Sequence, residues 1–155
     1  MDWKTLFFAP DGRIGRSTFW IGWLVLLGVN VVLGWIPLFG WLLSLVTIYC
    51  YVCVSAKRLH DMGKSGWLTL IPVVTAFILP VVGVFLFGGA ALFAGLTRMS
   101  EEAAAATVLS SLGGLILVVM ASWLVALGFL IWQGVSNGDP GENRYGPPPL
   151  QPVVA

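Results

Sequence analysis

Charged residues are scarce in this sequence of 155 residues. Eight residues are basic, seven are acidic and one is histidine, whereas 58% of the chain is hydrophobic. So few polar side chains cannot cover a water-soluble domain, and the mean hydropathy of +0.93 lies outside the range of such domains. The net charge of +1 also argues against a nucleic-acid partner. We therefore expect an integral membrane protein whose partners are membrane lipids, with eight tryptophans available as interfacial anchors.

Residues that build metal and redox sites are equally few. The two cysteines, Cys50 and Cys53, share one face of an apolar stretch with no further ligand set nearby. We interpret them as small packing residues and expect no metal and no cofactor. Asp2 and Asp11 precede an apolar run that starts only at residue 17, a pattern that disfavours a cleavable signal peptide.

Three long blocks carry no charge: residues 17–56, 65–97 and 103–138. A helix of about 20 apolar residues crosses the hydrocarbon core of a bilayer, and Pro37 and Gly40 divide the first block in two. The sequence therefore predicts an all-α fold, a polytopic transmembrane helical bundle. The four expected spans cover about residues 17–36, 38–56, 67–95 and 107–133.

These spans form a single integral membrane domain, residues 1–148, followed by a flexible C-terminal tail at 149–155. Prolines and paired glycines leave open whether residues 65–97 form one kinked span or two elements. The expected spans contain no Asp, Glu, Lys, Arg or His, which disfavours an ion pathway. Asn30 is expected to bond to a neighbouring helix.

The basic residues are unequally distributed between the two sides of the predicted bundle. Only Arg98 falls on one side. The other side has Lys4, Arg13, Arg16, Lys57, Arg58, Lys64 and Arg144. Because lysine and arginine favour the cytoplasm, we expect both termini there. This topology also brings three polar segments, residues 10–17, 57–66 and 137–149, to one surface.

The central polar segment, KRLHDMGKSGW at 57–67, raises the question of catalysis. On a helix, Arg58 can meet Asp61 and His60 can meet Lys64. A His–Asp pair can act as a general base, but no nucleophile or metal set accompanies it, so we predict no catalytic residue. The simpler explanation is that the basic residues hold the helix end at anionic headgroups. Asp61 then pairs with a basic residue of its own segment or of the N-terminal one.

The two outer segments add further candidates. GRIGR at 12–16 places Arg13 and Arg16 one helical turn apart, where they could anchor a span or grip a phosphate or carboxylate. The C-terminal segment could bind a proline-reading domain or fold back under the helices, held by Asn143, Arg144 and Tyr145. The predicted polar cluster, binding or structural, comprises Arg13, Arg16, Arg58, His60, Asp61, Lys64, Asn143 and Arg144.

Taken together, GRIGRSTFW, KRLHDMGKSGW and GDPGENRYGPPP resemble the motifs of a bacterial inner-membrane family, domain of unknown function 805. That family shows GR-x-x-R-x-x-[YF]-W, RLHD-x-x-[RK]-S-[GA]-W and G-x-x-G-x-NR-[FY]-GP in the same order. The resemblance implies a small multi-pass protein of the bacterial inner membrane with no established biochemical activity. The stretch between the last two motifs is longer here than usual and contains an expected loop at 98–106.

Three functions follow as hypotheses. The first is a non-enzymatic protein whose cytoplasmic polar cluster stabilises the bundle and binds an anionic lipid, a membrane-protein partner or a second copy of the chain. The second is an enzyme at the inner leaflet, which would use His60 and Asp61 and need a pocket beside them. The third is an oligomeric transporter or channel, which needs a polar path that these spans do not supply.

Overall fold

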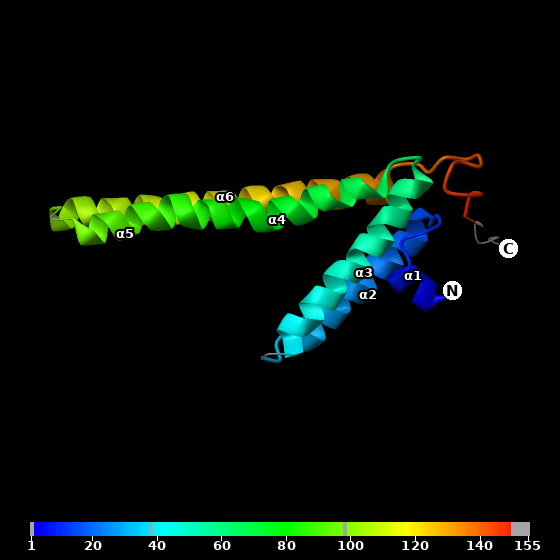
Figure 1. Cartoon of the computed structure of the whole chain (residues 1–155), viewed down its shortest axis with the longest axis horizontal. Helices are drawn as coiled ribbons and strands as arrows, with labels where there is room; N and C mark the ends of the chain where they lie inside the picture. The colour runs from blue at the N-terminus through cyan, green and yellow to red at the C-terminus, as the bar shows by residue number, and fades with distance from the viewer. Residues whose placement is uncertain (1, 38, 98, 150–155) are drawn as a thin grey trace. The chain divides into compact units, whose positions relative to one another are not determined.

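The structure, a computed structural model, describes residues 2–37, 39–97 and 99–149. All regular elements in this part of the chain are helical, and four helical stretches are long and apolar enough to cross a membrane. The elements, in the order followed by the colours of Figure 1, are α1 (Trp3–Phe8), α2 (Arg16–Leu33), α3 (Phe39–Asp61), the 3₁₀ turn η1 (Gly66–Thr69), α4 (Leu70–Gly83), the π-helical turn η2 (Val84–Gly88), α5 (Gly89–Leu96) and α6 (Glu101–Val135). The predicted all-α fold with four helices suited to cross a membrane is confirmed.

The first of two compact units contains Met1–Leu70 and Ile131–Ala155. Within it, α2 and α3 lie side by side. Thr47 Oγ1 donates to Asn30 Oδ1 at 3.4 Å, so the expected interhelical hydrogen bond of Asn30 is confirmed. The short helix α1 packs against α3 and buries Leu6 and Phe7. This unit contains all the polar segments singled out in the sequence.

The second unit, Ile71–Leu130, is a pair of long helical stretches. Helical structure continues from Gly66 to Leu96, so this region is one stretch. It contains a proline, Pro80, which has no N–H to donate, and shortly afterwards it widens into the π turn η2. The Phe87 ring lies against Gly114 of α6, where a Cβ atom would overlap it. Glycine therefore allows a close approach of these helices, as small residues do in membrane proteins.

The expected loop at 98–106 is wrong, because α6 already begins at Glu101. Ser100 Oγ accepts the Ala103 N–H at 3.3 Å, which caps the helix. Glu101 and Glu102 place negative charge at the positive end of the helix dipole, and alanines with high helix propensity follow. Of the predicted flexible tail, residues 150–155 lie outside the described part of the chain.

Candidate functional site

Arg58, His60 and Asp61 of the central segment lie on the last turn of α3, and Lys64 follows the end of this helix. This helix continues to Asp61 and does not end at residue 56 as predicted. Gly63 follows with a φ of +68°, and its N–H donates to the His60 carbonyl at 3.0 Å. The Lys64 N–H donates to the Leu59 carbonyl at 2.8 Å, which completes a Schellman motif. Glycine suits this left-handed position because a Cβ atom would be strained there.

A buried ion-pair triad closes this end of α3. Asp61 Oδ1 lies 3.1 Å from Arg13 Nη2, and Asp61 Oδ2 accepts from Arg58 Nη1. The side chains of Arg58, Arg13 and Asp61 are 0%, 1% and 5% exposed. Arg58 also donates from Nε to the Gln133 carbonyl at 2.8 Å and from Nη2 to the Ser136 carbonyl. The expected pairing of Asp61 is therefore confirmed, but Arg58 is inside the protein and does not reach a headgroup.

Arg13 connects the N-terminal segment to the C-terminal one. Its Nη1 donates to the carbonyls of Gly141 at 2.7 Å and Gly146 at 3.1 Å, and its Nη2 donates to the Asp139 carbonyl. In return, the Asp139 N–H donates to the Asp61 carbonyl at 2.7 Å. All these acceptors belong to the backbone, so Arg13 itself places no requirement on the side chains of residues 139, 141 and 146.

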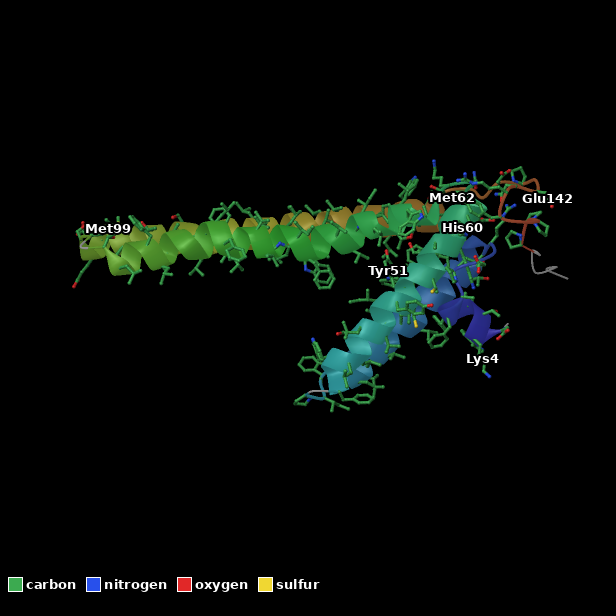
Figure 2. The ribbon with its side chains drawn as sticks, in the orientation of Figure 1. Lys4, Tyr51, His60, Met62, Met99 and Glu142 are labelled. Atoms are coloured by element: carbon green, nitrogen blue, oxygen red, sulfur yellow. The ribbon has the colours of Figure 1, made fainter. Side chains whose placement is uncertain are left out.

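His60 lies between the two outer segments. Its ring stacks on Tyr145 with 3.8 Å between the centroids and 9° between the planes. Its Nδ1 lies 3.2 Å from the Gly12 carbonyl, which can only accept, so Nδ1 is the donor. Asn143 Nδ2 donates to the His60 carbonyl at 3.0 Å. Figure 2 shows His60 at the end of α3, on the side of the C-terminal segment.

The C-terminal segment thus folds back onto the helix ends, but its three predicted contacts differ in kind. Asn143 and Tyr145 hold it to α3. Arg144 is exposed and places its guanidinium over the adjacent Tyr145 ring, 4.7 Å from the centroid. Arg144 therefore belongs to the outer surface of the segment.

Arg16 and Lys64 are two further exposed cations of the predicted cluster. Arg16 is the first residue of α2, whereas Arg13 precedes the helix, so the predicted one-turn spacing of these arginines is wrong. Arg16 Nη1 lies 3.5 Å from the Val135 carbonyl, and Lys64 Nζ lies 5.7 Å from the centroid of the Trp132 ring. Within the described ranges, neither cation has a carboxylate oxygen within 4.0 Å.

Lys57, expected to anchor the helix end, is also buried and 5% exposed. Its Nζ donates to the carbonyls of Thr5 and Leu6 at the end of α1. Tyr49 of α3 donates to the carbonyl of Phe8 at 3.1 Å. The last carbonyls of a helix lack partners within it, so Lys57 and Tyr49 satisfy those of α1 and hold it against α3.

Three buried polar residues beneath the triad are functional candidates that sequence reasoning missed. Ser55, Thr69 and Gln133 are each 0% exposed. Thr69 Oγ1 donates to Ser55 Oγ at 3.2 Å, and the Ser55 hydroxyl and Gln133 amide lie within 2.6 Å of each other. Each residue stands alone in an apolar stretch, so the sequence gives no signal that α3, η1 and α6 bring them together.

Comparisons with known proteins identify the family of this chain. The model of the family described as "Protein of unknown function (DUF805)" matches residues 7–147. The chain belongs to the DUF805 family. Relatives in two Escherichia coli strains, K12 and O157:H7, each called "Uncharacterized protein YiiR", are 33% identical over 148 residues, which cover 90% of this chain and 84% of theirs. No solved structure matches.

Glycines of the third motif are explained by this DUF805 structure. A Cβ atom on Gly138 would overlap the carboxylate of Asp61. Gly146 has a φ of +116°, which strains other residues, and its carbonyl accepts from Arg13. These glycines are therefore required by close packing and backbone conformation around the ion-pair triad.

The cysteines of this DUF805 protein, Cys50 and Cys53, are buried and free, in agreement with a packing role. Among residues 2–37, 39–97 and 99–149, no group of three metal-binding side chains is positioned to hold an ion.

Proposed function

We propose that this DUF805 protein is a non-enzymatic, multi-pass protein of the bacterial inner membrane with both termini in the cytoplasm. Its polar cluster locks the N-terminal segment and the C-terminal segment onto the ends of α3 and α6. The resulting rigid face binds membrane lipid or a protein partner. This proposal is based on the two ion pairs of Asp61, whose carboxylate contacts Arg13 of the N-terminal segment and Arg58 of α3.

The unfavourable free energy of burying charged groups supports a structural role for the triad. Burial of a charge is unfavourable unless partners replace the lost water, and removal of one partner of a buried pair is strongly destabilising. Here Arg13 and Arg58 are supplied with carbonyls from the C-terminal segment and from the end of α6. Every buried side-chain nitrogen and oxygen in the described part of the chain has a partner. Because all its buried polar atoms are hydrogen-bonded, the cluster is suited to hold the two terminal segments in place.

The enzyme hypothesis has less support from the geometry. Both candidate catalytic residues are engaged with other partners, because the ring of His60 stacks on Tyr145 and the carboxylate of Asp61 is held by two arginines. A groove of about 250 Å³ lies in the second unit and has no ionisable side chain in its lining. It is lined by Ala76, Pro80, Val119, Ser122, Trp123 and Ala126. General acid–base catalysis needs a titratable group within reach of a substrate, and this groove does not provide one.

Trypsin cleavage of the C-terminal segment tests both parts of the proposal. We expect cleavage after the exposed Arg144 in inverted membrane vesicles and not in intact spheroplasts, because the segment is cytoplasmic. Arg13→Gln should accelerate this cleavage at least tenfold, since it removes three hydrogen bonds to the segment. The matched control is Lys4→Gln, an exposed cation outside the cluster.

Two results would contradict the proposal. Cleavage from the outside of spheroplasts would reverse the proposed orientation. Equal cleavage rates for the native protein and Arg13→Gln would show that the cluster does not hold the C-terminal segment.

A further inference from the structure

We propose that Arg16 and Lys64 form a binding site for the phosphate of an anionic phospholipid headgroup. This inference rests on the proposed function, because it takes the ends of α2, α3 and α6 to lie at the inner leaflet. It goes further by naming two residues and one class of ligand.

Positive charge exceeds negative charge in the buried triad, and two exposed cations add to it. The triad carries a net charge of +1, because two arginines share the single carboxylate of Asp61, and Arg16 and Lys64 are further cations of the same unit. Arg16 lies close enough to Arg58 for the two cations to repel each other. The acids Asp11, Asp139 and Glu142 belong to the same unit, and the carboxylate of Asp139 accepts from the Gly141 N–H at 3.3 Å. In the described ranges none of these three acids forms an ion pair, so Arg16 and Lys64 have no carboxylate partner in direct contact.

Arg16 and Lys64 both lie close to the end of α6. Arg16 approaches the carbonyl of Val135, and Lys64 approaches the ring of Trp132, one turn earlier in α6. The two cations therefore flank the same last turn of a membrane-spanning helix. Trp20 adds a third contact there, with its Nε1 donating to the Gly134 carbonyl at 3.3 Å. Tryptophan is typical of the headgroup level of a bilayer, where lipid phosphates are found.

Arg16 and Lys64 are also more accessible to a ligand than the other cations of the cluster core. Arg13, Arg58 and Lys57 direct their donors to protein carbonyls and are buried. Arg16 and Lys64 are exposed, and the contact of Arg16 with the Val135 carbonyl is at the 3.5 Å limit of a hydrogen bond. Arginine can offer two parallel N–H groups to a phosphate, and lysine adds a compact charge. Together they suit one phosphodiester.

Native mass spectrometry of the full chain, released from nanodiscs that contain phosphatidylglycerol and phosphatidylcholine, tests the site. The double variant Arg16→Gln/Lys64→Gln should lower the affinity for phosphatidylglycerol roughly 30-fold, about fivefold for each cation. Lys4→Gln neutralises an exposed cation outside the cluster and should lower it less than threefold. Arg16→Lys/Lys64→Arg keeps both charges and should retain the lipid.

Several outcomes would overturn this site. Equal losses in the two neutralised variants would show general attraction between the protein and anionic lipid. Displacement of the lipid by millimolar inorganic phosphate would identify a soluble anion as the ligand. Unchanged affinity in Arg16→Gln/Lys64→Gln would show that these residues do not bind the lipid. The proposed function would not be affected by this result, because it is tested separately by trypsin cleavage.

Discussion

Replacement of Asp61 by asparagine should destabilise the protein more than any other single exchange of a carboxylate for an amide. Asparagine has nearly the same shape but no charge, so Arg13 and Arg58 would remain buried without a counterion. Loss of one partner from a buried ion pair costs about 3–5 kcal/mol. This corresponds to a shift of roughly 200- to 5,000-fold in the folding equilibrium.

The assay is reversible unfolding in mixed micelles of dodecyl maltoside and sodium dodecyl sulfate, followed by tryptophan fluorescence. Asp11→Asn is the matched control, because Asp11 is exposed and forms no ion pair among the described residues. We expect this control to change the free energy of unfolding by less than about 0.5 kcal/mol.

A double-mutant cycle with Arg13→Gln measures the interaction energy between Asp61 and Arg13 separately from the other effects of each exchange. The two exchanges should be non-additive by about 1–3 kcal/mol, because both disrupt the same contact. If Asp61→Asn and Asp11→Asn have equal stabilities, the buried triad does not hold the fold together and the reasoning fails.

Three further perturbations test neighbouring contacts. Gly138→Ala should destabilise the protein by about 1–3 kcal/mol in the same micelle assay, because its Cβ atom would overlap Asp61; an unchanged stability would contradict the packing. Lys57→Met should release α1 from α3 and increase trypsin cleavage after Lys4, whereas protection equal to the native protein would show that Lys57 does not hold α1. Gly146→Ala should cost about 1 kcal/mol or more because of its positive φ, and no loss of stability would argue against this conformation.

Much of the fold could be predicted from the sequence because the charge-free blocks are long. Three such blocks allow four spans by length alone, and the structure contains four suitable helices. The ends of the helices were harder to predict. α3 continues to Asp61 because its charges are buried by partners from distant segments, and charge alone suggests that the helix stops before them.

The candidate site was only partly predictable, for a related reason. Helical spacing correctly indicated that Arg58 and Asp61 could meet. The same spacing could not show that Arg58 is fully buried or that Arg13 reaches backbone carbonyls of the C-terminal segment. Such contacts depend on tertiary structure, and backbone acceptors have no sequence signature. Gln133 was missed for this reason.

Hydrogen exchange of the C-terminal segment in nanodiscs tests the central claim most directly. The amide of Asp139 donates to the Asp61 carbonyl at 2.7 Å, and the amide of Gly146 donates to the Asn143 carbonyl at 2.9 Å. The account predicts slow exchange over residues 139–146 in the native protein and fast exchange in Arg13→Gln, with the spans unchanged in both. Exchange of the native segment at the rate of an unstructured peptide would contradict the lock.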